Sequence, residues 1–245
     1  MDYYNSNEDL NIHYKKDSSI VSLADIESEK LIRNAIKEKF PEHSILGEEK
    51  GFTEGKSEYI WYIDPLDGTT NYSIHYPFFC ISIALCKKTD PLLSVVYFPP
   101  QNELFYAVKN KGAFLNNKKL KVSSENSLKN AIIAFSNSRD EGQIRQIAKI
   151  FLKFKLLKQK LRHFGSAALE MCYVASGRIS AFFSLGTNIW DVAAGMLLVK
   201  EAGGIITNLK GDNIPLDRNI NNIIASNGLI HKNLLNLLNS ITSKY

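Results

Sequence analysis

The chain has 245 residues, of which 44% are hydrophobic and 22% are charged, and its net charge is +5. These values are typical of a soluble globular protein with a substantial core. The sequence lacks an apolar run of the roughly 20 residues that a transmembrane helix needs, and its first twenty residues are too polar for a secretory signal.

The cysteines Cys80, Cys86 and Cys172 are an odd number and lack metal-site spacing. We expect each to be a buried free thiol, which fits the reducing cytoplasm.

Residues 1 to 19 are polar and without periodicity, so we expect them to be partly flexible. Apolar residues at helical spacing then predict a helix from Ala24 to Phe40, which Pro41 ends. Ser22 and Asp25 fit a capping box at its start. Asp25 is therefore a candidate helix cap, a role that does not exclude another one.

Runs of β-branched and aromatic residues predict strands at 59–63, 78–85, 92–97, 104–108 and 131–135. Turn signals at 99–100 and 110–112 favour an antiparallel meander. The later chain predicts helices at 141–155, 166–176, 191–202 and from 229, with strands at 179–183 and near 205 and 223. The pattern is α+β turning to α/β. The length allows one large domain or two closely packed lobes, and because no repeat or low-complexity linker divides the chain we expect a single domain over residues 1–245.

Six basic residues alternate with apolar ones late in the chain: Lys149, Lys153, Lys155, Lys158, Lys160 and Arg162. The stretch is either the solvated side of an amphipathic helix or a patch that binds nucleic acid or attracts an anionic substrate.

Residues 61–71 run from an apolar strand into a turn that contains two carboxylates. Asp64 and Asp67 flank a Pro-constrained turn, so their carboxylates can converge on a hard cation. Gly68 and Thr69 offer backbone N–H groups at a predicted helix start, where phosphate is favoured. The ordinary alternative is an Asx-rich β-turn.

Two further segments carry acids that packing does not require: Gly47-Glu48-Glu49 and Trp190-Asp191. Asp191 lies in the first turn of a predicted helix, where it is either a cap or a ligand. We expect Trp190 to belong to the core.

Several other chemistries are excluded by spacing. Asp64 and Asp67 are separated by two residues, whereas a phospho-aspartyl mechanism of the haloacid dehalogenase type needs one. A P-loop motif is absent from the sequence. The five histidines are scattered, which argues against zinc and Ser-His-Asp sites.

The three motifs, 47–49, 64–71 and 190–195 with 201–204, resemble in this order those of the inositol monophosphatase family, over roughly residues 12 to 235. The resemblance implies a layered αβαβα sandwich, shared with the fructose-1,6-bisphosphatases. It also implies a magnesium-dependent, lithium-sensitive phosphomonoesterase that forms a homodimer. The default substrate is inositol 1-phosphate.

The resemblance assigns roles to individual residues. The ligands of two or three Mg²⁺ ions would be Glu48, Asp64, the Leu66 carbonyl, Asp67 and Asp191. Glu48 and Asp64 would hold the ion that activates water, with Thr69 and Asp25 assisting catalysis, and Asp64, Asp67 and Asp191 would hold the ion at the leaving oxygen. Substrate contacts would come from Asp67, Gly68, Thr69, Gly165, Ser166, Ala167 and Asp191.

Two departures from the family pattern bear on function. Ser184 occupies the position of a glutamate that binds substrate hydroxyls, which keeps fructose 1,6-bisphosphate, histidinol phosphate and 3′-phosphoadenosine 5′-phosphate open as substrates. The chain also has room only for a shorter first helix, which affects dimerisation. A different class of function is an RNA- or partner-binding role with a vestigial site, suggested by the basic stretch between Lys149 and Arg162.

Overall fold

The computed structural model describes residues 1, 4, 12–14, 20–136, 140–216 and 220–242. Most of residues 1–19 therefore lies outside the described residues. The flexibility and the shorter first helix expected there stay predictions. The described helices are α2 (Leu23–Lys39), α3 (Thr69–Ser73), α4 (Glu141–Leu156), α5 (Ala167–Ala175), α6 (Ile189–Glu201) and α7 (His231–Thr242), with a 3₁₀ turn at Pro99–Gln101.

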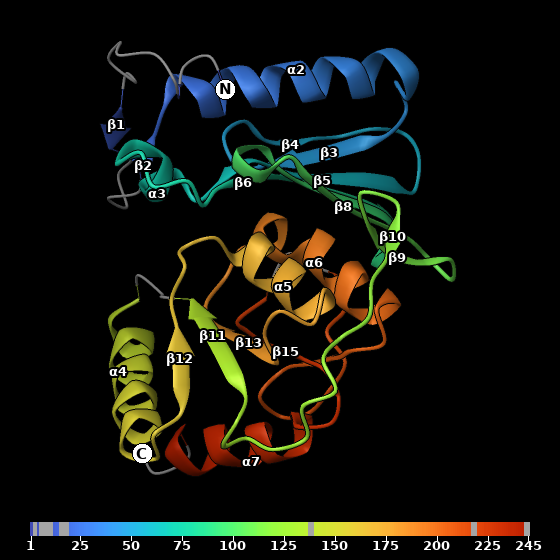
Figure 1. Ribbon diagram of the computed structural model, residues 1–245. Helices are drawn as coiled ribbons and strands as arrows, with labels where there is room; N and C mark the ends of the chain where they lie inside the picture. Colours follow the sequence, from blue (N-terminus) through green and yellow to red (C-terminus); the bar gives the residue numbers. More distant parts are fainter. Residues whose placement is uncertain (2–3, 5–11, 15–19, 137–139, 217–219, 243–245) are drawn as a thin grey trace.

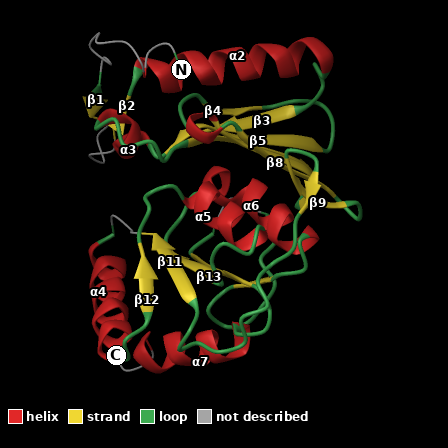
Figure 2. Cartoon of the chain, viewed as in Figure 1, coloured by secondary structure: helices red, strands yellow, loops and turns green. Residues whose placement is uncertain are grey.

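Five layers are stacked in the molecule (Figure 1). Helix α2 covers the outer face of an eight-stranded sheet, and α5 and α6 lie between that sheet and a five-stranded one. Helices α4 and α7 cover the far face of the second sheet. Figure 2 shows the same alternation of helix and strand layers. The αβαβα sandwich expected from the motifs is confirmed.

The larger sheet has the order β10-β9-β8-β7-β6-β5-β3-β4. Its strands are β3 (Ser44–Gly47), β4 (Gly51–Thr53), β5 (Tyr59–Asp67), β6 (Cys80–Lys87), β7 (Asp90–Phe98), β8 (Glu103–Val108), β9 (Gly112–Leu115) and β10 (Lys118–Lys119). From β5 to β10 neighbouring strands are antiparallel, as the predicted meander requires. Strands β3 and β5 are parallel, so both end at the same edge.

The smaller sheet has the order β12-β11-β13-β15-β14. Its strands are β11 (Ile132–Ser136), β12 (Lys160–Arg162), β13 (Ala181–Leu185), β14 (Ile205–Thr207) and β15 (Asn222–Ser226). Strand β11 is parallel to both of its neighbours, whereas β15 is antiparallel to both of its own. A two-stranded hairpin of β1 (His13–Tyr14) and β2 (Ile20–Val21) stands apart from both sheets.

The middle layer is apolar on every side because sheets cover it from both directions. Residues 192–199 of α6 are all buried. Gly195 allows α6 to approach α5, since a Cβ at this position would lie 2.6 Å from the Cβ of Met171. This close packing fixes the start of α6 relative to the start of α5, and both helix starts border the site described below.

The predicted helices and strands are present with ends close to those expected, except that β5 continues past Ile63 to Asp67. The interpretation of the basic stretch 149–162 as the solvated side of an amphipathic helix holds for Lys149, Lys153 and Lys155, which are exposed on α4, and is wrong beyond Leu156. Helix α4 ends at Leu156, where Lys158 has a φ of 59° and the Gln159 N–H bonds the Phe154 carbonyl. Lys160–Arg162 then pairs with β11 as strand β12. No described helix has the length and apolarity that a membrane span requires.

Candidate active site

The predicted acidic residues meet at one edge of the larger sheet. Glu48 follows β3 and Asp64 and Asp67 end β5, so the parallel pair delivers all three to the same place. Asp191 comes from the first turn of α6, as predicted. Asp64 is buried, whereas Asp67 and Asp191 are partly buried.

A β-bulge in β5 sets the direction of two carboxylates. Asp64 lies opposite Ser82 of β6 and Asp67 lies opposite Cys80, so three steps along β5 match two steps along β6. Residues three apart on a regular strand point to opposite faces. The extra residue absorbed here places Asp64 and Asp67 on the same face.

Backbone and hydroxyl donors hold one oxygen of each aspartate. Asp64 Oδ1 accepts the N–H of Leu66 at 3.0 Å. Asp67 Oδ2 accepts the Ser166 hydroxyl at 2.7 Å and the Ala168 N–H at 2.6 Å. Asp191 Oδ2 accepts the Asn188 N–H at 2.9 Å and the Thr187 hydroxyl at 3.1 Å. Asp191 therefore caps its helix, and only its second oxygen is available to a ligand.

The carboxylates repel one another. Burial, followed by the charges of Glu48, Asp67 and Asp191, raises the pKa of Asp64 well above its usual range. Burial also raises the pKa of Asp67 to about 6 and, together with the charges of Asp67 and Glu48, that of Asp191 to about 8. The ion pairs formed by the described residues include none of the three aspartates. The site therefore concentrates negative charge that its own side chains do not neutralise.

The donor set fits Mg²⁺, since carboxylate and carbonyl oxygens are the ligands that this hard cation prefers. In the described part of the chain, no three His, Cys, Asp or Glu side chains converge closely enough to form a metal site as they stand. One oxygen of each aspartate is turned to a protein donor instead. Coordination would therefore require rotations of these side chains and would relieve their mutual repulsion.

Asp25 and Thr69 are brought together, as the motifs implied. One oxygen of Asp25 accepts the N–H and hydroxyl of Ser22 at 2.8 and 2.6 Å, while the other accepts the Thr69 hydroxyl at 3.2 Å. Asp25 is thus both the helix cap and the partner of Thr69. Burial raises its pKa, and the nearby charge of Glu48 adds to this effect.

The glycine-bearing turns also border the site. Gly68 has a φ of 101° and precedes the five-residue helix α3. Gly165 has a φ of 81° and contacts Asn71. Ser166 is only 1% exposed and gives its hydroxyl to Asp67, an arrangement that orients this carboxylate. Ala167 begins α5 beside it.

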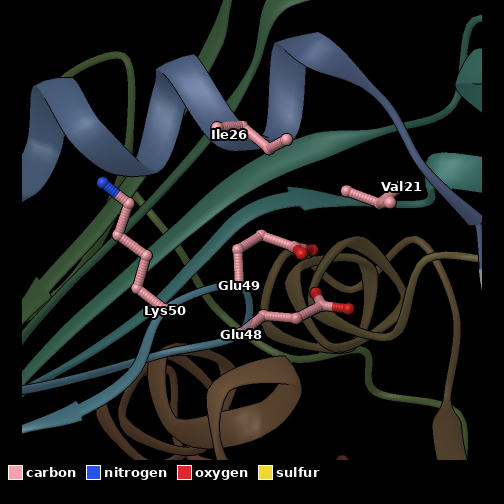
Figure 3. Close-up of a pocket in the computed structure, with 5 residues that line it drawn as sticks. All are labelled: Val21, Ile26, Glu48, Glu49 and Lys50. Carbon is pink, nitrogen blue, oxygen red and sulfur yellow. The ribbon is translucent and has the colours of Figure 1, made fainter. Parts of the chain in front are cut away.

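A pocket of ≈ 440 Å³ opens beside Glu48. Figure 3 shows Glu48 and Glu49 extending to the same side, with Lys50 directed away toward α2. Val21 and Ile26 form an apolar wall. The pocket is large enough for a small organic phosphate and carries acidic groups on one side.

A buried ion pair that the sequence reasoning missed supports Glu48. Arg33 Nε donates to Glu29 Oε1 at 2.6 Å, and Glu29 accepts the N–H groups of Glu49 and Lys50 at 2.7 and 3.1 Å. A Cβ on Gly47 would lie 2.5 Å from Glu29 Oε1. We name Glu29 and Arg33 the α2 clamp, because they fix the turn that carries Glu48. Their i, i+4 spacing was the available signal.

A second missed pair holds the turn at Gly165. Asn71 Nδ2 donates to the carbonyls of Phe78 and Phe164 at 2.8 and 2.7 Å. Glu170, fully buried in α5, accepts the Phe164 N–H at 2.7 Å. The turn before α5 is thus held from the sheet side and from the helix side.

Ser184 is closed off from solvent, whereas Trp190 is partly exposed. Ser184 is 0% exposed and donates its hydroxyl to the Gly186 carbonyl at 3.2 Å, so it offers nothing to a substrate. Trp190 is partly buried and packs against the central core, as expected.

Known proteins resemble this chain over most of its length. The family model described as inositol monophosphatase family matches residues 1–244. The Nus factor SuhB of Xylella fastidiosa is 39% identical over 218 residues, which cover 87% of this chain and 78% of that protein. A fructose-1,6-bisphosphatase/inositol-1-monophosphatase of Aquifex aeolicus is 36% identical over 226 residues, 92% of this chain and 84% of its own length.

Solved structures share the fold. The Thermotoga maritima IMPase has a TM-score of 0.87 at 34% identity and covers 96% of this chain and 89% of that one. An IMPase/NADP phosphatase complexed with Mg²⁺ and phosphate has a TM-score of 0.80 at 27% identity, with 94% and 86% covered. With the family model matched along nearly its whole length, this chain belongs to the inositol monophosphatase family.

Proposed function

We propose that this protein is a magnesium-dependent phosphomonoesterase that hydrolyses a small polyol or sugar phosphate, with inositol 1-phosphate as the default substrate. One observation carries the proposal: Asp64, Asp67 and Asp191 share one site with Glu48, and burial, together with the charges of neighbouring carboxylates, raises the pKa values of the aspartates. Such a cluster is costly to a folded protein unless cations bind to it.

The proposed ligands are Glu48, Asp64, the Leu66 carbonyl, Asp67 and Asp191. The solved IMPase/NADP phosphatase that contains Mg²⁺ and phosphate supports this choice of metal. When bound, Mg²⁺ would lower the pKa of water and stabilise negative charge on the phosphoryl group and the leaving oxygen. Phosphate monoesters hydrolyse very slowly unaided, so catalysis depends on this charge stabilisation.

Thr69 and Asp25 are the proposed path for the proton of the attacking water. The Thr69 hydroxyl lies 3.2 Å from Asp25 Oδ1 and 3.0 Å from the Leu66 carbonyl, and its single proton serves one of them at a time. When it donates to Asp25, its lone pairs can accept a proton from water. The water oxygen bonds phosphorus as the ester P–O bond breaks, and the proton passes through Thr69 to Asp25. The raised pKa of Asp25 makes it a better acceptor near neutral pH. The departing alkoxide takes its proton from solvent.

The phosphate oxygens would be received by backbone N–H groups. Those of Gly68 and Thr69 stand at the start of α3, where intrahelical acceptors are lacking. Gly165 and Ala167 are the proposed contacts from the opposite side, on the turn that Asn71 and Glu170 hold. This arrangement favours in-line attack through positioning.

The proposed reaction is a single one, but several substrates are kept for it. Ser184 is buried and cannot replace a glutamate that binds hydroxyls. Fructose 1,6-bisphosphate, histidinol phosphate and 3′-phosphoadenosine 5′-phosphate therefore remain alternatives, the first in keeping with the name of the Aquifex aeolicus relative. A homodimer, inhibition by lithium and a cytoplasmic location are also proposed from the family resemblance.

The test is phosphate release with Mg²⁺ across these four substrates. Asp64→Asn serves as the inactive variant, and Glu38→Gln, at an exposed position of α2, is the matched control. We expect release by the parent chain and the control and none by Asp64→Asn. Equal release by Asp64→Asn would refute the proposed site.

An RNA- or partner-binding role with a vestigial site is the second candidate. Relatives that carry the name Nus factor SuhB are as similar as the named phosphatases, up to 40% identical. Against it stands the complete set of acids, which a vestigial site would not need to keep. Salt-dependent RNA binding, together with silence in the phosphatase assay, would favour this second role.

A further inference from the structure

Helix α4 presents an exposed surface on which apolar and basic residues form separate rows. It lies at the outer edge of the smaller sheet, beside β12 and α7 (Figure 1). Ile147, Ile150 and Phe154 are buried against the sheet. The opposite side still carries large apolar side chains, which is unusual for a helix whose inner face is already covered.

The exposed apolar row repeats once per turn. Ile144, Ala148, Leu152 and Leu156 stand four residues apart, and the three large side chains are 47%, 61% and 70% exposed. Residues at this spacing form a continuous ridge along one side of a helix. Ala148 leaves a notch in the ridge, into which a side chain from another helix can fit.

A basic row runs beside it, one position further along the chain. Arg145, Lys149 and Lys153 are also four residues apart and exposed, and Arg145 forms an ion pair with Glu141 one turn before it. Residues 141–162 contain seven Lys and Arg and one Glu, a net charge of +6, which exceeds the +5 of the whole chain. The remainder of the protein is therefore close to neutral. Four of the seven cations lie on α4 itself, and the other three follow it at Lys158 and in β12.

We propose that the outer surface of α4 binds an acidic amphipathic helix of a protein partner. Such a helix would lay an apolar ridge against Ile144, Leu152 and Leu156 and direct carboxylates, one per turn, toward Arg145, Lys149 and Lys153. Ridges at i, i+4 spacing on both helices pack into each other's grooves. Helix α4, with 16 residues, offers about 24 Å of contact.

Other occupants match the surface less well. A second copy would bring two strongly basic rows together, which like-charge repulsion disfavours. RNA would satisfy the basic row but leave the aliphatic ridge against charged phosphates. The exposed aromatic ring of α4, Phe151, already contacts Phe135, so little is offered for stacking on bases. An anionic bilayer would have to meet a narrow ridge with the carboxylate of Glu141 at one end.

The experiment uses the full chain and a synthetic helical peptide as a probe. The peptide, of about 18 residues, carries leucines on one i, i+4 row and glutamates on the adjacent row. A second peptide has glutamine in place of glutamate. Fluorescence anisotropy measures binding at low and at physiological salt. We expect the acidic peptide to bind with a Kd below about 100 µM at low salt and the neutral peptide to bind more weakly.

Variants of the protein then locate the contact. Leu152→Gln and Lys153→Glu should each weaken binding by about tenfold or more. Lys37→Glu, an equal charge change at an exposed position of α2, should not alter it. All three should keep the phosphatase activity of the parent chain, so failure here is distinguishable from failure of the proposed function.

Three results would overturn the proposal. The first is the absence of peptide binding up to about 1 mM. The second is binding that Leu152→Gln and Lys153→Glu leave unchanged. The third is capture by phosphatidylglycerol vesicles, by single-stranded RNA or by a second copy in sedimentation, lost in the same variants, without peptide binding.

Discussion

Two groups of buried charge lie close together in this protein and are treated in opposite ways. In the α2 clamp, Glu29 and Arg33 are 0% and 5% exposed, and they bond to each other and to the turn after β3. At the carboxylate site, Asp64, Asp67 and Asp191 have hydroxyl and backbone donors but no described cationic partner. One group is electrically complete and the other is not.

The difference in charge pairing separates a group that supports the structure from a group suited to bind a cation. A paired buried charge that is fully hydrogen-bonded specifies a local structure, because breaking it leaves an unpaired charge. An unpaired cluster of acids stores repulsion that only an added cation relieves. The α2 clamp holds the turn that carries Glu48. A paired group of charges therefore positions one of the acids of the carboxylate site.

Replacing Asp64 should have the largest effect on activity. We expect Asp64→Asn to lower turnover by about 10³-fold or more, because a shared metal ligand is lost. The free energy of unfolding of the metal-free protein should stay the same or rise, because repulsion is relieved. Phosphate release and urea unfolding measure the two effects. A marked loss of stability would mean that Asp64 is a structural residue.

Breaking the α2 clamp should lower the free energy of unfolding, whereas Asp64→Asn should leave it unchanged or raise it. Glu29→Gln or Arg33→Met leaves a buried partner unpaired and should cost about 3–5 kcal/mol in unfolding free energy. The double variant should cost less than the sum of the two single ones. In variants that remain folded, half-saturation with Mg²⁺ should need more metal, and the Glu49 and Lys50 amides should exchange hydrogen faster. Unchanged amide exchange would argue against the positioning role.

The pH dependence of the metal-free protein sharpens the same contrast. The folded-state pKa values of Asp67 and Asp191, about 6 and about 8, lie above the ordinary value of 3.8. The folded chain thus binds more protons than the unfolded chain, and stability is lost as pH rises from about 4 to 8. We expect the melting temperature to fall by about 5 °C or more between pH 5.5 and pH 8.

Added Mg²⁺ should reverse that loss at pH 8 in the parent chain, and less so in Asp191→Asn. A melting temperature that is flat over this range without metal would contradict the carboxylate repulsion.

The smallest effect is expected at Ser166. Its hydroxyl donates to Asp67 Oδ2 together with the Ala168 N–H, and the Cys80 thiol is a weaker third donor at 3.9 Å. Ser166→Ala should lower kcat/KM by about tenfold, the size of one hydrogen bond to a charged group, with little change in stability. Ser166→Thr keeps the donor and is the matched control. Equal losses in both variants would point to crowding at the turn.

Local sequence signals carried the predictions that succeeded. The turn from Asp64 to Asn71 and the first turn of α6 are short segments in which the residue types indicate the local backbone structure. The meander was predicted from runs of β-branched residues. The short strands β3, β4 and β12 were missed because they are too short for periodicity and depend on neighbouring strands. The role of Glu29 was missed because its partners lie on a distant turn.

The bulge in β5 makes chain length itself a functional parameter. Asp64 and Asp67 share a face only because β5 has one extra residue between them, opposite the step from Ser82 to Cys80 in the neighbouring strand. Deleting Leu66 would keep every acidic side chain in the sequence, yet restore a regular strand in which the second aspartate faces a different environment. Insertions and deletions should therefore be tolerated in the hairpin turn at Asn116–Asn117 and rejected between residues 64 and 67.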